Sequence, residues 1–246
     1  MEFSRKKAWS PLEREVGNWK KMLIAIHQPQ YLPWLGYLDK IDKADVFVIL
    51  DNVQFKKNEW QNRNRIKTSQ GCQWITVPVL YRFTEKINEV RVNNRENWGR
   101  KHLQTLITNY SKSPYFENYK SFFEDIFNCN WNCLVDINIE IIKFLISALG
   151  LKTRLVIASD LELREEPTER LIDICKSLDG NKYLAGQDGN KYMNLELFEK
   201  EDIEVIFQDF KHPVYNQLFE DFEPYMSAID LLFNCGDDSL EILRGK

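Results

Sequence analysis

The chain has 246 residues, of which 43% are hydrophobic and 28% are charged, and its formal net charge at pH 7 is −4. This length can bury a sizeable core in one domain or in two small ones. The acidic balance disfavours a general nucleic-acid-binding protein, which would need a clearly basic face. No apolar run reaches the ~18 residues that a transmembrane helix requires.

Cysteine usage and the first residues bear on compartment and boundaries. The five cysteines form no disulfide-like framework, and no secretory signal precedes them, so we expect a cytoplasmic protein. Cys129 and Cys133 have no second pair or nearby histidine, so we expect no metal site. Residues 1–21 are polar and basic, and either they form a surface appendage or the native start is Met22.

The first predicted unit is a strand, a helix and a second strand. Met22 to Ile26 and Val46 to Leu50 are short apolar runs typical of buried strands, and the apolar residues between them follow helical spacing. Such a unit makes the two strands parallel. Polar residues follow both strands, beginning at His27 and at Asp51, so we expect the two ends to face one crevice.

The middle of the chain changes character twice. Trp74 to Leu80 and Ile87 to Val92 both alternate and predict a hairpin of short strands, with Pro78 favouring an edge position. From Asn97 to Gly150 the apolar residues follow helical spacing, which predicts an all-helical insert of three helices.

Strands and helices then alternate again. Thr153 to Ala158, Tyr183 to Ala185 and Ile203 to Phe207 predict strands, with helices after Pro167 and at Leu195 to Phe198. The expected fold is α/β, with a mainly parallel Rossmann-like sheet flanked by helices. We expect residues 22–246 to form one domain with a helical insert around 97–150.

Candidate catalytic residues come from the ends of the first two strands. The chain lacks a phosphate loop, a GxGxxG turn, GxSxG and HExxH, so His27 is the leading candidate for a general base. Asp51 could orient that imidazole or hold a substrate amine. The structural alternatives are a histidine that hydrogen-bonds a loop carbonyl and an aspartate that caps a turn. His102 shares an apolar stripe and predicts a core histidine, and Asp230 lies in an apolar helix, where it needs a partner.

Candidate binding residues lie in three segments: the loop after the first strand, the amide- and arginine-rich stretch after Asp51, and the GQDGNKY loop. Arginines bind phosphate or carboxylate bidentately, which predicts a small anionic substrate. The glycine loop could add backbone amides, or it could simply be a turn. The substrate-binding candidates are Gln28, Gln30, Gln54, Lys57, Asn62, Arg63, Asn64, Arg65, Gly186, Gly189 and Tyr192.

Several segments resemble the WbqC-like protein family over Met22 to Gly236. They are IHQPQYLPWLGYLDKIDKAD, DNVQF, NRNRIK, W-x-T-V-P-V, NYSKSPYF, YLAGQDGNKYM and FEPYMSAIDLLFNCG. The resemblance implies a role in surface polysaccharide (O-antigen) synthesis, as a transferase that moves an acyl or aminoacyl group, such as glycyl, onto a nucleotide-linked or lipid-linked sugar. The alternatives are a non-catalytic nucleotide-sugar binding or assembly protein and a nucleotide-dependent ligase.

A weaker similarity links the first unit to the nucleotidyltransferase and pantothenate synthetase core. That group uses an HxGH loop, whereas this chain has Trp34-Leu35-Gly36-Tyr37 at the matching position, which disfavours adenylation. The sequence therefore predicts an anionic small-molecule substrate, with a nucleotide sugar as the leading class. It specifies no cofactor, and it leaves a homodimer open.

Overall fold

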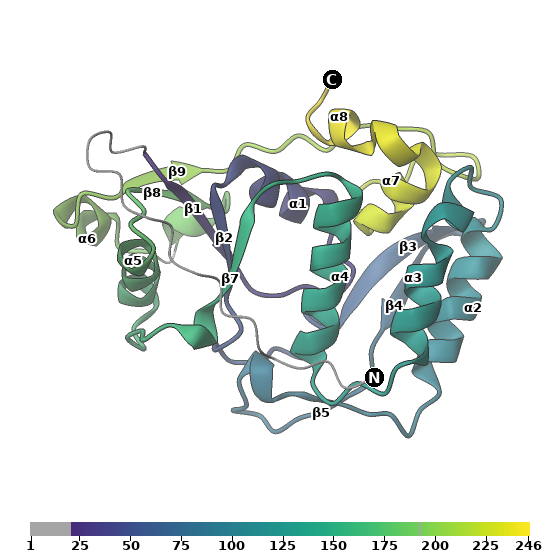
Figure 1. The fold of residues 1–246 in the computed structure, drawn as a ribbon, viewed down its shortest axis with the longest axis horizontal. Helices are drawn as coiled ribbons and strands as arrows, with labels where there is room; N and C mark the ends of the chain where they lie inside the picture. Colours follow the sequence, from purple (N-terminus) through teal and green to yellow (C-terminus); the bar gives the residue numbers. More distant parts are fainter. Residues whose placement is uncertain (1–20, 192) are drawn as a thin grey trace.

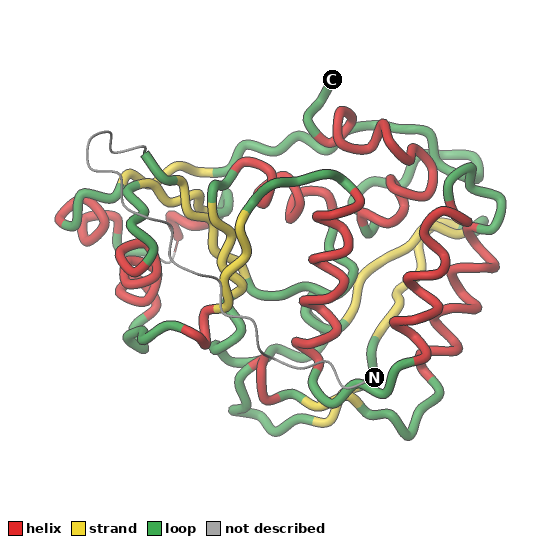
Figure 2. The backbone as a smooth tube through the Cα atoms, viewed as in Figure 1, coloured by secondary structure: helices red, strands yellow, loops and turns green. Residues whose placement is uncertain are grey.

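The computed structural model describes residues 21–191 and 193–246. The expected N-terminal extension, apart from its last residue, and Tyr192 therefore lie outside the described residues. At the centre is a five-stranded parallel sheet in the order β7-β2-β1-β8-β9 (Figures 1 and 2). Its strands are β1 Leu23–His27, β2 Val46–Ile49, β7 Arg154–Ile157, β8 Lys182–Ala185 and β9 Glu204–Phe207. The prediction of one parallel sheet is confirmed.

The strand order places a topological switch point between β1 and β8. Numbered along the chain, the five strands run 3-2-1-4-5, so the connections turn away from each other on either side of that pair. In such sheets ligands bind beyond the carboxyl ends of the strands at the switch point. The sequence predicts the crevice between β1 and β2, whereas the topology moves it to the other side of β1.

Alternating side chains on the strands build two cores. Ile24 and Ile26 face a smaller core with the helices α5 and α6, and Ala25 faces the main core with the remaining helices. Figure 1 shows α5 and α6 on one side of the sheet and α1 and α4 on the other. These helices are α1 Leu35–Lys43, α4 Leu134–Ala148, α5 Pro167–Ser177 and α6 Leu195–Lys200.

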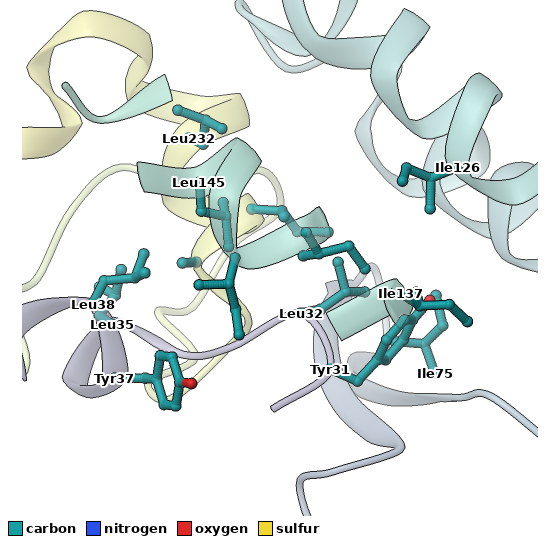
Figure 3. Close-up of a cluster of buried hydrophobic side chains, with 14 of the residues drawn as sticks. Tyr31, Leu32, Leu35, Tyr37, Leu38, Ile75, Ile126, Ile137, Leu145 and Leu232 are labelled. Carbon is teal, nitrogen blue, oxygen red and sulfur yellow. The ribbon is translucent and has the colours of Figure 1, made fainter. Parts of the chain in front are cut away.

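The predicted helical middle segment is confirmed and belongs to the main core. It consists of α2 Trp98–Tyr110, α3 Phe116–Asn128 and α4, and the C-terminal helices α7 Ala228–Cys235 and α8 Ser239–Leu243 pack with it. Leu35 and Leu38 from α1 lie near Leu145 of α4 and Leu232 of α7 in Figure 3. Apolar packing therefore connects the middle helices to the sheet without a separate core.

Two antiparallel hairpins complete the chain. The polar segment Arg63–Thr68 is itself a strand, β3, paired with β4 Gly71–Thr76. The predicted pairing of the next strands is also present, as β5 Val79–Leu80 with β6 Arg91–Val92.

Two of the predicted strand boundaries are wrong. Trp74 to Leu80 is divided into β4 and β5, with Val77 and Pro78 between them, and Pro78 has no amide hydrogen for a sheet. Ile87–Glu89 is a 3-10 turn, in which Glu89 accepts a hydrogen bond from the Lys86 amide. Ile87 and Val90 are both fully buried, so their spacing of three serves one turn of helix rather than a strand face.

Candidate functional site

At the switch point, the backbones of β1 and β8 stop pairing before β1 ends. Pairing between β1 and β8 begins at Leu23 with Lys182 and ends at Ala25 with Leu184, whereas β1 stays paired with β2 as far as His27. The last residues of β1 therefore have no paired neighbour on the β8 side. A side-chain carbon built on Gly186, directly after β8, would meet no described atom within 4 Å. The two strands therefore separate at the point where ligands bind in sheets of this topology.

His27 lies at the end of β1 on the α1 side of the sheet. Its ring is 5.0 Å from that of Tyr37, and its Nδ1 is 3.0 Å from the Gln28 carbonyl oxygen. A carbonyl only accepts, so Nδ1 carries the proton and Nε2 holds a lone pair. Burial, with the nearby Lys40 charge, lowers the His27 pKa to about 4, so the imidazole is neutral at neutral pH.

Lys40 is the residue that the sequence interpretation missed at this place. It comes from α1, and its Nζ donates a 2.9 Å hydrogen bond to the Ile26 carbonyl, just past the last β1–β8 pair. On the β8 side Nζ lies 5.9 Å from the centre of the Tyr183 ring. Burial lowers the Lys40 pKa to about 7. Lys40 lies three residues after the buried Tyr37, on the same face of α1. This helical spacing is the signal in the sequence that could have identified Lys40 as buried.

Asp51 holds the end of β2 to the segment after β7. Its Oδ1 accepts from the Ser159 amide at 2.9 Å, and its Oδ2 accepts from the Ser159 hydroxyl at 2.7 Å. The residue is 2% exposed. The interactions of the described residues include no bond from Asp51 to His27. The group that orients His27 is therefore the Gln28 carbonyl. In the described part of the chain, Asp51 caps no turn that follows it and instead links the end of β2 to Ser159.

Several amide side chains secure the loops around the crevice. Gln28 accepts a 2.7 Å hydrogen bond from Gln61, which connects the loop after β1 to the segment before β3. Asn64 is fully buried and donates to the carbonyls of Tyr31 and Leu32. Its oxygen accepts from the Arg65 amide. Asn64 thus positions the loop and has no group left for a substrate.

The other candidate amide side chains differ in which of their hydrogen-bonding groups have no partner. Gln54 is exposed and donates to the Phe83 carbonyl at 2.7 Å. Asn62 donates to the Val77 carbonyl at 3.0 Å. Among the described residues, the side-chain oxygens of Asn62 and Gln30 are buried without a hydrogen-bond partner. These two oxygens are acceptors that remain unused.

The two candidate arginines, both on β3, pack against the rings of Trp60 and Trp74. The guanidinium carbon of Arg63 lies 4.2 Å from the centre of the Trp74 ring. That of Arg65 lies 5.9 Å from the Trp60 ring and 5.8 Å from the Trp74 ring. The two indoles are 5.4 Å apart, and Trp74 is 43% exposed. Both arginine Nε atoms are buried without a partner in the described part of the chain.

Residues 186–191 of the GQDGNKY segment directly follow β8. Gly189 to Lys191 forms a 3-10 turn, and the Gly189 amide donates to the Gly186 carbonyl. Gly189 is buried, and an added side-chain carbon would lie 2.8 Å from Met193. Lys57, in the segment between β2 and β3, is exposed. The turn of one interpretation is therefore present, and the anion-binding amides of the other stay a prediction.

The start of α1 is covered. A side-chain carbon on Gly36 would lie 2.2 Å from the Trp34 ring, so the glycine gives the indole its place against the first turn. The Gly36 carbonyl accepts from Gln208, whose side chain also binds Asp39 at 2.7 Å. This packing disfavours the α1 N-terminus as an anion site.

Two surface hollows lie away from His27. One, of about 610 Å³, separates β4 from α2 and includes Trp74 and His102. His102 is engaged on both nitrogens, by the Tyr31 hydroxyl and the Thr76 carbonyl, which confirms a satisfied core histidine. The other, of about 450 Å³, lies beside α5.

The described part of the chain holds neither a membrane span nor a metal cluster. In residues 21–191 and 193–246, no helix is long and apolar enough to cross a membrane. No group of three or more His, Cys, Asp or Glu residues in these ranges could hold a metal ion.

Comparison with known proteins agrees with the resemblance. The model of the WbqC-like protein family matches residues 28–242. An uncharacterized protein of Mycobacterium tuberculosis, Rv1507c, is 38% identical over 228 residues, which cover 90% of this chain and 97% of that protein. No solved structure matches the chain. The chain therefore belongs to the WbqC-like protein family.

Proposed function

We propose that the chain is a transferase that moves an acyl or aminoacyl group onto an amine or hydroxyl of a nucleotide-linked or lipid-linked sugar. The observation that carries the proposal is His27 at the switch-point crevice, with Nδ1 donating to a carbonyl and Nε2 left as a base. The family resemblance supplies the setting of surface polysaccharide synthesis. The crevice supplies a place where such chemistry would occur.

One base is enough for the proton transfers of this reaction. The acceptor nitrogen or oxygen forms a bond to the acyl carbon and gives its proton to His27 Nε2. The bond from the acyl carbon to its leaving group breaks, and Nε2 returns the proton to that group. A base with a pKa of about 4 is weak, but an anionic substrate beside it favours the imidazolium and raises that pKa.

The remaining candidates are assigned to substrate binding. Arg63 and Arg65 would hold a phosphate or carboxylate, with Trp74 offering an exposed ring face to a sugar. Lys57 and the Gly186 loop would close over the ligand. Asp51 serves indirectly, because its bonds to Ser159 fix the end of β2 next to His27.

The test combines a binding assay with a turnover assay on nucleotide-linked amino sugars and acyl donors. His27→Ala should leave sugar binding largely intact and lower kcat about a hundredfold or more, because a general base acts on the chemical step. Arg63→Lys should weaken binding by about 1–3 kcal/mol, since the planar fork is lost. Arg154→Lys, at the opposite end of the sheet, is the matched control.

The outcomes separate the proposal from its alternatives. Binding without any turnover would identify a nucleotide-sugar binding or assembly protein. Turnover that depends on a nucleoside triphosphate would identify a ligase. Wild-type kcat in His27→Ala would rule out His27 as the general base of a transferase, whatever the substrate.

A further inference from the structure

Lys40 occupies an unusual place for a lysine. The side chain is 2% exposed, and its ammonium lies at the switch point, where β1 and β8 separate. One of its hydrogens is donated to the Ile26 carbonyl, which belongs to a part of β1 that has no paired neighbour on the β8 side. An ammonium has three donors, so two remain for another acceptor.

No acid of the described residues neutralises this charge. The ion pairs and hydrogen bonds of residues 21–191 and 193–246 include no carboxylate partner for Lys40. Asp39, its neighbour on α1, is bound to Lys43 at 2.9 Å and to Gln208 at 2.7 Å. Burying an unpaired charge is costly, and it persists in proteins mainly where function requires it.

The surroundings of the ammonium contain few titratable groups. From β1 comes His27, which is neutral near pH 7 because its pKa is about 4. From β8 comes Tyr183, whose ring lies beneath the ammonium. α1 itself adds Tyr37, whose pKa burial raises well above 10, together with the Asp39–Lys43 pair. None of these groups supplies an anion that is free to bind Lys40.

We propose that the crevice between β1 and β8 is an oxyanion-binding site, and that the Lys40 ammonium receives a phosphate or carboxylate group of the substrate there. Gly186, directly after β8, leaves open space where a side chain would stand, since an added carbon would meet no described atom within 4 Å. The proposal deepens the transferase function, because it places a second anionic group of the substrate, in addition to the one assigned to Arg63 and Arg65, near His27. It rests on that function only for the identity of the substrate.

Binding of an oxyanion at this place takes up a proton. Burial lowers the Lys40 pKa to about 7, so above neutral pH the amine of the free protein is mostly uncharged. A bound oxyanion favours the ammonium and raises that pKa. Binding therefore becomes weaker as the pH rises above 7, because the amine must first be protonated.

The experiment measures binding of two small oxyanions by isothermal titration calorimetry at constant ionic strength. Sulfate represents a phosphate group and acetate a carboxylate group, and neither titrates between pH 6 and 9. The apparent Kd of the wild type should weaken roughly ninetyfold from pH 6 to pH 9. Saturable binding of sulfate alone assigns a phosphate group to the site, and binding of acetate alone assigns a carboxylate group.

Matched variants on the same helix identify the amine. Lys40→Met keeps the length and apolar contacts of the side chain, and it should abolish saturable binding together with its pH dependence. Lys43→Met, three residues further along the helix, should bind as the wild type does, because the Lys43 amine is held by Asp39. Circular dichroism confirms that both variants fold.

The wild type alone gives a second measurement, which decides the matter if Lys40→Met does not fold. Titration at pH 8 in two buffers of different ionisation enthalpy should show uptake of about 0.9 proton per bound anion. Unchanged binding in Lys40→Met, binding that does not vary with pH, or no saturable binding of either anion would each overturn the proposal. These outcomes do not involve turnover, so a failure of the transferase function is seen separately in the kinetic assay.

Discussion

At the scale of single residues, His27 and His102 contribute strongly to how stability depends on pH. The pKa of His27 and that of His102 are both lowered to about 4 from 6.5, in each case chiefly by burial. Between those values the unfolded chain binds protons that the folded chain does not. Stability therefore rises with pH from about 4 to 6.5 and is lost as the pH falls through this range.

We expect His102→Gln to remove about half of this acid sensitivity. Lowering the pH from 6.5 to 4 should cost the wild type on the order of 3 kcal/mol for each histidine. The glutamine amide can still donate to the Thr76 carbonyl, but it does not titrate. Urea unfolding at pH 7, 5.5 and 4.5 measures the slope.

Tyr31→Phe is the control for the hydrogen bond that His102→Gln also loses. It removes the 2.8 Å bond between the Tyr31 hydroxyl and His102 while keeping the imidazole. It should lower stability at every pH and keep most of the slope. An acid slope in His102→Gln equal to that of the wild type would show that His102 is not the titrating group.

At the scale of elements, one glycine sets the approach of two helices. A side-chain carbon on Gly99, in the first turn of α2, would lie 2.0 Å from the Phe127 carbonyl oxygen of α3. That neighbour is backbone and cannot rotate away. The pair of helices therefore requires a residue without a side chain at this position.

Gly99→Ala should accordingly destabilise the protein by about 1–3 kcal/mol, although alanine has the higher helix propensity. Gln104→Ala, on the exposed side of the same helix, should change stability by less than about 0.5 kcal/mol. Chemical denaturation of both variants gives the comparison. A Gly99→Ala protein as stable as the Gln104→Ala protein would mean that α2 and α3 pack differently.

Hydrophobic patterns in the sequence predict the strands of the central sheet but not strand β3. Apolar runs predict all five strands of the sheet, because the sheet is covered by helices on both faces and its strands carry few polar residues. Arg63–Thr68 has a single aliphatic side chain, Ile66, so its strand is hidden from any hydrophobic pattern. That strand is held by contacts distant in sequence, such as the Asn64 bonds to the Tyr31 and Leu32 carbonyls.

The sequence predicts the site only in part for the same reason. His27 lies at a strand end that the sequence reveals. The neighbour of β1 across the crevice is β8, about 155 residues later in the chain, and no local pattern gives that order. A lysine is normally expected on the surface, so the residue type alone does not indicate that Lys40 is buried. Its ammonium binds the Ile26 carbonyl, beyond the last residue pair of β1 and β8.

At the scale of the whole molecule, a buried polar network joins the helical middle segment to the C-terminal region. Asp230 on α7 is fully buried and accepts from the hydroxyls of Tyr110 on α2 and Tyr215 at 2.8 and 2.9 Å. Gln217 donates to the same carboxylate at 2.8 Å. The acid that the sequence left in need of a partner thus has three, and it connects parts of the chain more than 100 residues apart.

This network and the continuous main core predict that residues 22–246 unfold as one unit. Apolar side chains from α1, β2, α2, α3, α4 and α7 belong to one cluster, so no boundary separates the helical insert from the sheet. Differential scanning calorimetry of a chain that begins at Met22 should show one transition, with equal calorimetric and van't Hoff enthalpies. Its Tm should lie within ~4 °C of that of the full chain, because we expect the polar and basic residues 1–21 to form a surface appendage. A larger fall in Tm would place residues 1–21 in the folded body, and two separate transitions would make the helical insert a domain of its own.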